Sequence, residues 1–258
     1  MLNATVVKRL NVTDELVILR IKPDAGVPEF SPGQYLAIGL FGNAPRPDHF
    51  PPEREEQKPD KIIKRAYSIG SSPQCRDDIE LYIAIVPDGA LTSRLALVKE
   101  GDRIFAAPKI TGTFTIGEVP SNENLVLVST GTGLAPYISM VRTASTWSEG
   151  RSVTIIHGVR YSKDLAYADE LIELAKQCSN FKYLPIVSRI DPEWTGAQGH
   201  IQSLFDNHVL SVSAERDHVF LCGNPAMIDD METRLLASGY AVHSKKEPHG
   251  KLHLEKYW

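Results

Sequence analysis

The spacing of apolar residues changes near residue 120, and this change constrains the fold more than any other feature of the chain. Before it, short apolar or alternating runs are separated by turn residues such as Pro23-Asp24 and Gly101-Asp102. The runs cover residues 6–7, 16–21, 35–40, 64–69, 81–86 and 104–106. Runs of this kind predict antiparallel strands, and about six of them favour a small closed barrel.

After residue 120, short buried-type strands alternate with helical patterns. The expected strands cover residues 125–129, 153–156, 184–187 and 219–222, and the expected helices cover residues 135–142, 165–177, 201–209 and 227–238. This alternation indicates a parallel α/β sheet. The polar segment 118–124 is typical of a linker. We therefore predict a two-domain chain: a six-stranded antiparallel β-barrel over 1–120 and an α/β parallel-sheet nucleotide-binding domain over 121–258.

Composition narrows the class of protein. A length of 258 residues suffices for two domains, and a net charge of -4 argues against a nucleic-acid binder. No apolar run approaches a membrane span, and the first residues lack the apolar core of a signal peptide. The scattered cysteines, Cys75, Cys178 and Cys222, fit a reducing compartment and are too few for a four-cysteine iron–sulfur cluster. We expect a cytoplasmic protein without nucleic-acid or membrane contacts and without a metal site.

The segment 42–61 interrupts the barrel pattern with five prolines and many charges. We interpret it as an exposed, mobile loop. Two roles are open: a contact with a partner, or a plain insertion.

The strand 64–69 carries three kinds of side chain that a flavin needs. The guanidinium of Arg65 suits a phosphate, the ring of Tyr67 suits the face of an isoalloxazine, and the hydroxyl of Ser68 suits a ring nitrogen. The alternative is an edge strand with an exposed Arg and a half-buried Tyr.

The segment 86–95 predicts a strand, a turn and then a helix over 91–99. Gly89 lets the backbone approach a ligand, and Leu91, Thr92 and Ser93 stand at the expected helix start, which suits a pyrophosphate. The alternative is an ordinary capped helix.

Three strand ends in the second half carry special chemistry: two suit nucleotide phosphates, and the third places a small thiol at the edge of the sheet. They are Thr130 to Pro136, Val187 to Arg189, and Cys222 to Pro225. Taken alone, the Arg could be a surface residue and the Cys a structural one. Together they stand at the carboxyl ends of strands in one sheet, where open α/β sheets bind ligands.

These motifs, in this order, resemble the bacterial subclass of the ferredoxin–NADP⁺ reductases. The resemblance covers nearly the whole chain. It is carried by Arg-Ala-Tyr-Ser at 65–68, Pro-Asp-Gly-Ala-Leu-Thr-Ser-Arg-Leu at 87–95, Gly-Thr-Gly-Leu-Ala-Pro at 131–136, His-Gly-Val-Arg at 157–160, Val-Ser-Arg at 187–189, Cys-Gly-Asn-Pro at 222–225 and Glu-Lys-Tyr-Trp at 255–258.

The resemblance implies an FAD-containing enzyme that takes a hydride from NADPH and passes single electrons to ferredoxin or flavodoxin. It implies that Tyr67 stacks on the isoalloxazine, that Ser68 lies near its N5, and that Thr132 lies close to flavin and nicotinamide. Tyr257 would cover the other flavin face, and Trp258 would stack on the adenine of a bent FAD. The remaining FAD-binding positions implied are Arg65, Ala66, Leu91, Thr92 and Ser93.

For NADP(H), the resemblance implies that Cys222 and Glu255 flank the nicotinamide beside Ser68. With Tyr257 these residues form the expected catalytic set. The implied NADP-binding positions are Gly131, Gly133, Arg160, Ser188, Arg189, His200, Gly223, Asn224 and Pro225. The family usually has an Arg where this chain has His200, so we expect a less strict preference for NADPH.

Two alternative hypotheses about the function are open. One is an NAD(P)H-dependent flavin reductase or the reductase component of an oxygenase, and the other is a flavin-binding subunit that does not react with NADPH. For the favoured reading we expect a monomer with a cationic rim for an acidic carrier protein. The candidate cations are Lys61, Lys64, Lys245, Lys246, Lys251 and Lys256.

Overall fold

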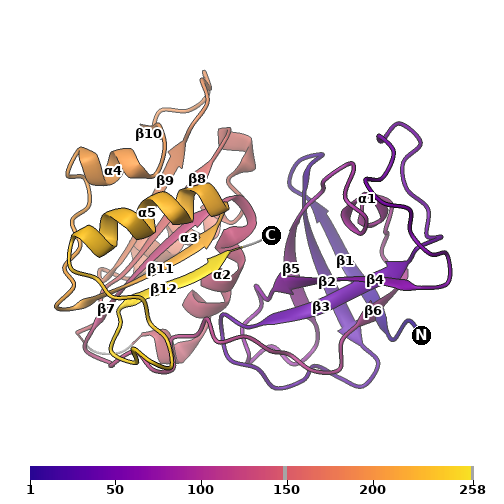
Figure 1. Ribbon diagram of the computed structural model, residues 1–258, viewed down its shortest axis with the longest axis horizontal. Helices are drawn as coiled ribbons and strands as arrows, with labels where there is room; N and C mark the ends of the chain where they lie inside the picture. Colours follow the sequence, from indigo (N-terminus) through magenta and orange to yellow (C-terminus); the bar gives the residue numbers. More distant parts are fainter. Residues whose placement is uncertain (148–149, 257–258) are drawn as a thin grey trace. The chain divides into compact units, whose positions relative to one another are not determined.

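The computed structural model describes residues 1–147 and 150–256 and divides into two compact units (Figure 1). The first unit holds Met1–Thr115 and Ile138–Thr143, and the second holds Ile116–Tyr137 and Ala144–Trp258. No helix among the described residues is both long and apolar enough to span a membrane. Tyr257 and Trp258, which carry two of the predicted roles, lie outside the described residues.

The first unit is an antiparallel barrel, as predicted. Its sheet has the order β4-β3-β6-β1-β2-β5, and every pairing is antiparallel. An antiparallel bridge between Ile69 and Leu81 connects the end of β4 to β5 and closes the sheet. The strands are β1 (Ala4–Asn11), β2 (Leu16–Pro23), β3 (Tyr35–Phe41), β4 (Ile62–Ser68), β5 (Ile79–Ala84) and β6 (Arg103–Ala106).

Alternate residues of each strand fill the barrel, because successive side chains of a strand point to opposite faces. In β2 the inward residues are Val17, Leu19 and Ile21, each at most 1% exposed. Leu36 and Ile38 of β3 do the same and are fully buried. One continuous apolar core thus supports the strand that carries the predicted flavin residues.

The helix expected over 91–99 is wrong in length. Helix α1 covers only Thr92–Leu95, and tighter i→i+3 bonds follow it, from Leu97 N to Arg94 O and from Val98 N to Leu95 O. The Arg9 guanidinium donates to the carbonyls of Leu95 and Val98 at 2.7 and 2.9 Å. These bonds satisfy the carbonyls at the helix end, so the chain turns away there.

The loop 42–61 is exposed along much of its length, as predicted, and it is attached to the barrel at its ends and near its middle. Its ends continue the pairing of β3 and β4 through a 2.8 Å bond from Gly42 N to Lys61 O. Phe50, near its middle, packs against the barrel core.

The second unit is a parallel sheet in the order β10-β9-β8-β7-β11-β12, and every pairing is parallel. Strand order reverses between β7 and β11, which makes this pair the switch point of the sheet. The strands are β7 (Asn124–Thr130), β8 (Val153–Val159), β9 (Phe181–Val187), β10 (Ala197–Gln198), β11 (Asp217–Gly223) and β12 (Leu252–Lys256). The prediction of a parallel α/β sheet is confirmed, although β10 and β12 were not predicted.

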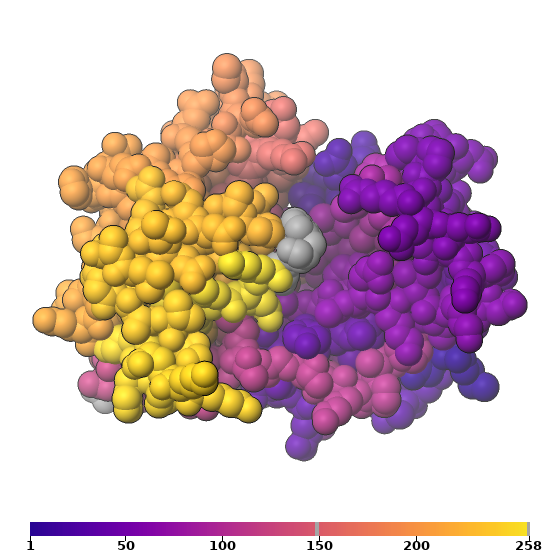
Figure 2. Space-filling view, in the orientation of Figure 1, coloured from indigo at the N-terminus to yellow at the C-terminus, as the bar shows by residue number. Residues whose placement is uncertain are grey.

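Two helices cover one face of this sheet. Residues at spacing two in β7, Val126 and Val128, share a buried cluster with Leu204 of one helix and with Met227 and Met231 of another. Figure 1 shows α5 crossing that face, and Figure 2 shows its outer side on the surface of the unit. The helices of the unit are α2 (Ala135–Val141), α3 (Ala168–Gln177), α4 (Gln202–Asp206) and α5 (Pro225–Ala237).

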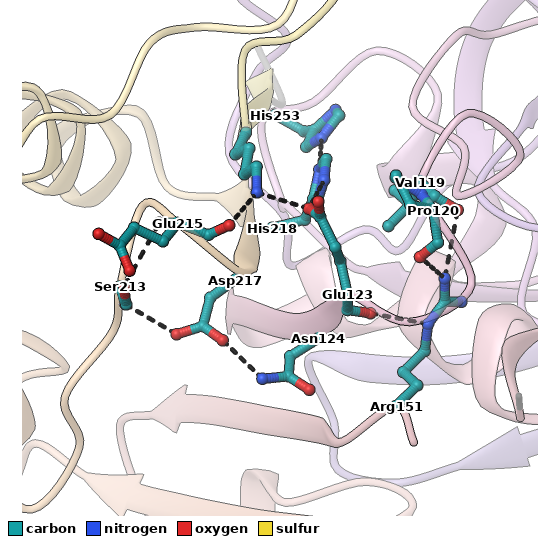
Figure 3. A network of polar contacts seen from close by, with 11 residues as sticks. Val119, Pro120, Glu123, Asn124, Arg151, Ser213, Glu215, Asp217, His218 and His253 are labelled. Atoms are coloured by element: carbon teal, nitrogen blue, oxygen red, sulfur yellow. Dashed lines mark hydrogen bonds and ion pairs between the residues drawn. The ribbon is translucent and has the colours of Figure 1, made fainter. Parts of the chain in front are cut away.

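The segment 118–124, expected as a linker, is held within the second unit by one buried cation. Arg151 is 3% exposed and donates to the carbonyls of Val119, Pro120 and Glu123 at 3.2, 2.6 and 2.9 Å (Figure 3). The Asn124 amide adds a 2.7 Å bond to Asp217 of β11. These bonds fix the start of β7, whose other end carries the glycine-rich turn.

Candidate functional site

Strand β4 presents the predicted flavin-binding side chains of the first unit. Arg65 and Ala66 are exposed, Ser68 is 4% exposed, and Tyr67 is half-buried against the barrel core. Arg65 donates to the Lys64 carbonyl at 2.8 Å and pairs with no carboxylate in the described part of the chain. Burial raises the pKa of Tyr67, so the phenol stays protonated. The strand therefore offers an unpaired guanidinium, a neutral aromatic ring and a hydroxyl.

The turn 86–93 carries donors without protein acceptors. The Ser93 hydroxyl is fully buried and has no hydrogen-bond partner among the described residues. Within the same ranges, the backbone amides of Leu91 and Thr92 donate to no protein acceptor. Buried polar groups are normally paired, so such a set indicates a bound group that accepts hydrogen bonds.

The geometry of this turn depends on Gly89. A Cβ there would lie 2.4 Å from Thr92 Oγ1, which is itself bonded to the backbone of Val86 at 3.0 and 3.2 Å. Glycine is thus required for the turn to close. The unpaired donors at 91–93, and Arg65 without a carboxylate partner among the described residues, fit the pyrophosphate of FAD.

In the second unit, the ends of β7 and β11 meet at the switch point. A Cβ on Gly133 would lie 2.4 Å from the Cys222 carbonyl oxygen, and a Cβ on Gly223 would lie 2.4 Å from Thr130 Oγ1. Thr130 Oγ1 also accepts a 2.8 Å bond from Asn224 N. Because both glycines lack a side chain, the turn that follows β7 packs directly against the end of β11.

The turn that follows β7 is a short 3₁₀ helix, Gly131–Leu134, that leads into α2. Gly131 has φ 51° with open space where a Cβ would stand, and Thr132 is 8% exposed. Beside it, Asn224 accepts from Ala226 N at 2.8 Å, and Pro225 occupies the first turn of α5. Both predicted nucleotide turns thus lie together where open α/β sheets bind ligands.

The structure brings Cys222 and Glu255 together. They are register partners on the parallel strands β11 and β12, and the Cys222 Sγ donates to Glu255 Oε2 at 3.9 Å. Cys222 is fully buried. Ser68, predicted to act with them, belongs to the first unit, and Tyr257 lies outside the described residues.

His157 is a residue of this region whose role the sequence did not indicate. Its ring is fully buried in β8, with Nε2 3.2 Å from the Gly131 carbonyl and Nδ1 3.3 Å from the Tyr183 hydroxyl. Burial lowers its pKa to about 4, so the imidazole is neutral. A neutral ring that donates to the Gly131 carbonyl and accepts from the Tyr183 hydroxyl holds the glycine-rich turn in position. The sequence showed it within an apolar strand and in the motif His-Gly-Val-Arg at 157–160, but assigned it no role.

Three exposed basic residues follow the carboxyl ends of neighbouring strands: Arg160 after β8, Arg189 after β9 and His200 after β10. Arg189 N donates to the Arg160 carbonyl at 3.0 Å, and Ser188 Oγ donates to the Val159 carbonyl at 3.1 Å. None of the three basic side chains pairs with a carboxylate among residues 1–147 and 150–256. Such a group suits a phosphate.

The six lysines expected to form a cationic rim are not equivalent. Lys256 pairs with Asp229 at 2.6 Å and Lys251 with Glu123 at 2.7 Å, while the Lys64 ammonium lies 4.4 Å from the centre of the Phe105 ring. Lys61, Lys245 and Lys246 are exposed without an ion pair among the described residues. Two of the six positions are thus neutralised locally.

Known proteins resemble this chain over both units. The family model of the oxidoreductase NAD-binding domain matches residues 127–233. A flavodoxin/ferredoxin–NADP reductase of Escherichia coli is 30% identical over 259 residues, covering 98% of this chain and 97% of its own. A ferredoxin–NADP reductase of Pseudomonas aeruginosa is 30% identical over 239 residues, covering 88% and 86%.

A solved structure extends the comparison to three dimensions. The crystal structure of a ferredoxin NADP⁺ reductase from Neisseria gonorrhoeae with bound FAD and NADP has a TM-score of 0.82. It is 25% identical and covers 99% of this chain and 98% of its own. Since relatives at 30% identity span nearly the whole sequence, the chain belongs to the flavodoxin/ferredoxin–NADP reductase family.

Proposed function

We propose that this protein is an FAD-dependent reductase that moves electrons between NADPH and a one-electron carrier, ferredoxin or flavodoxin. The observation that carries the proposal is 30% identity to such a reductase over 98% of the chain. A flavin can take a hydride from a nicotinamide and release its two electrons singly, which neither a nicotinamide nor an iron–sulfur protein can do.

The first unit supplies the FAD-binding residues. Tyr67 offers its ring face to the isoalloxazine, and Ser68 offers a hydroxyl to the N5 edge. Arg65, which has no carboxylate partner among the described residues, and the unpaired donors of the 91–93 turn hold the two phosphates. The exposed Ala66 lies between Arg65 and Tyr67 and leaves room for the cofactor. We assign the FAD domain to residues 1–120.

The second unit, assigned here to residues 121–258, supplies the NADP(H)-binding residues. The turns with Gly131, Thr132 and Gly133 and with Gly223, Asn224 and Pro225 approach the pyrophosphate and nicotinamide. Arg160, Ser188, Arg189 and His200 bind the 2′-phosphate, since Arg160 and Arg189 are exposed and have no carboxylate partner among the described residues.

Cys222 and Glu255 orient the nicotinamide. Their pairing at 3.9 Å places a small polarizable group and a carboxylate acceptor at the end of two adjacent strands. Ser68 completes this set from the flavin side. Tyr257 shields the flavin until the nicotinamide displaces it, and Trp258 stacks on the adenine of FAD.

The carrier docks through charge. The lysines without carboxylate partners, Lys61, Lys64, Lys245 and Lys246, are the candidates for contact with an acidic protein. We place the enzyme in the cytoplasm, because its three cysteines form no disulfide and suit a reducing compartment, and we expect a monomer.

Identification of the bound flavin tests this proposal. The purified protein should be yellow and should release one FAD per chain on denaturation, as measured by chromatography of the released chromophore. FMN, or no flavin, would remove the basis of the proposal, because the 91–93 turn and Trp258 are assigned to the diphosphate and adenine that FMN lacks.

A further inference from the structure

Side chains of the loop 42–61 reach the turn 86–94 at three places. Arg46 Nη2 donates to the Pro87 carbonyl at 2.9 Å, and Arg54 Nε pairs with Asp88 at 2.6 Å. The third contact is an ion pair between Glu53 and Arg94. A loop without an apolar run of its own is thus fastened to one short segment of the barrel.

Arg94 is the centre of this attachment. Its side chain is 4% exposed, and Nη1 donates to Glu53 Oε1 and, at 2.6 Å, to the Ala90 carbonyl. Nη2 donates to Glu53 Oε2 at 3.1 Å and to the Gly42 carbonyl. One guanidinium therefore joins the start of the loop, its middle and the turn. Lysine, with a single nitrogen, lacks the planar fork that this arrangement requires.

The ion pair between Glu53 and Arg94 is largely buried, so its main effect is on the position of the groups to which it bonds. The Glu53 side chain is 15% exposed, and its hydrogen bond to Arg94 lowers the pKa of its carboxyl. Buried ion pairs add little net stability, but loss of one partner leaves an uncompensated charge and disturbs what the pair holds. Here the pair holds the carbonyl of Ala90, next to the donors of Leu91, Thr92 and Ser93.

We propose that the loop 42–61 is a brace that holds the 89–93 turn in its FAD-binding geometry, with Glu53 and Arg94 as positioning residues. The inference rests on the proposed function, which assigns this turn to the FAD pyrophosphate. Because the brace bonds to the Ala90 carbonyl, it leaves the amides of Leu91 and Thr92 and the hydroxyl of Ser93 available to the cofactor. Donors held in place before binding lose little freedom when the ligand arrives.

The test measures FAD binding to the apoprotein of the full chain. Binding is monitored through the quenching of flavin fluorescence. Glu53→Gln keeps the shape and removes the charge, and we expect the Kd for FAD to rise about tenfold. Arg94→Lys should raise it at least as much. The matched control is Arg54→Gln in the same loop: its pair with Asp88 is exposed on the arginine side (77%), so the Kd should change about twofold at most.

A second variant separates a positioning role from general loss of structure. Glu53→Met with Arg94→Met removes both charges, which usually leaves a fold intact, yet it also removes the bond to Ala90. Far-UV circular dichroism should match the wild type while FAD binding weakens as in Glu53→Gln. At saturating FAD, the KM for NADPH should stay at the wild-type value in every variant.

Two results would overturn the proposal. One is FAD affinity within about twofold of wild type in the folded double variant. The other is equal weakening by Arg54→Gln, which would mean that any change in the loop has this effect. Failure of the wild-type apoprotein itself to bind FAD is a different outcome, because it refutes the proposed function.

Discussion

Mild acid should destabilise the second unit through His157. Its ring is fully buried, and burial lowers its pKa from 6.5 to about 4. The unfolded chain therefore takes up the proton at higher pH than the folded one. The stability that the neutral ring contributes is present above pH 6.5 and is lost as the pH falls toward 4. These two values give a loss of about 2 kcal/mol at ~pH 5 and about 3 kcal/mol at ~pH 4.

Urea unfolding of wild type and His157→Asn at ~pH 7.5 and ~pH 5 measures this loss. The variant should be less stable at the higher pH because it leaves a cavity, but its stability should fall by about 2 kcal/mol less on acidification. Tyr183→Phe is the control, since it removes the hydroxyl at 3.3 Å and keeps the titrating ring. Equal acid losses in wild type and His157→Asn would refute the reasoning.

Four further results are expected. Arg189→Ala should lower kcat/KM for NADPH about 10- to 100-fold more than for NADH, because a charged hydrogen bond to phosphate is lost. His200→Arg should raise the NADPH-to-NADH ratio of kcat/KM, and an unchanged ratio would exclude His200 from the phosphate site. Deletion of Tyr257 and Trp258 should tighten NADP⁺ binding in titrations and weaken FAD retention by about 1–3 kcal/mol. No change in either quantity would mean that the two residues bind neither FAD nor the nicotinamide site. Burial lowers the pKa of His253 to about 3, so urea unfolding of His253→Gln should show a smaller acid loss than wild type, and an equal loss would argue against this.

The sequence predicted those parts of the fold that local patterns encode. The barrel strands were visible because inward positions such as Val17, Leu19 and Ile21 alternate with outward ones. The glycine-rich turn after β7 was visible because Gly131 and Gly133 follow an apolar strand within three residues. The structure shows that a Cβ on Gly133 would collide with the Cys222 carbonyl.

Other parts depend on contacts between distant residues and could not be read from the sequence. Glu53 and Arg94 are 41 positions apart, and nothing near either one indicates a buried pair. Strand β12 (Leu252–Lys256) was missed because it mixes apolar, basic and acidic residues and is the last strand of the sheet, next to β11. The helix from 91 was overestimated because Arg9, far away in sequence, bonds to its last carbonyls. Individual site assignments, including those of Ser68 and Glu255, stay predictions until tested.

Carrier reduction by NADPH tests the central claim most directly. Holoenzyme is mixed anaerobically with NADPH, and bleaching of the flavin is followed by stopped flow. Ferredoxin, flavodoxin and free flavin are then each offered as acceptors. The account predicts rapid bleaching by NADPH, slower bleaching by NADH, and faster electron delivery to a carrier protein than to free flavin. No bleaching would indicate a subunit that does not react with NADPH, and preference for free flavin would indicate a flavin reductase; either result would contradict the account.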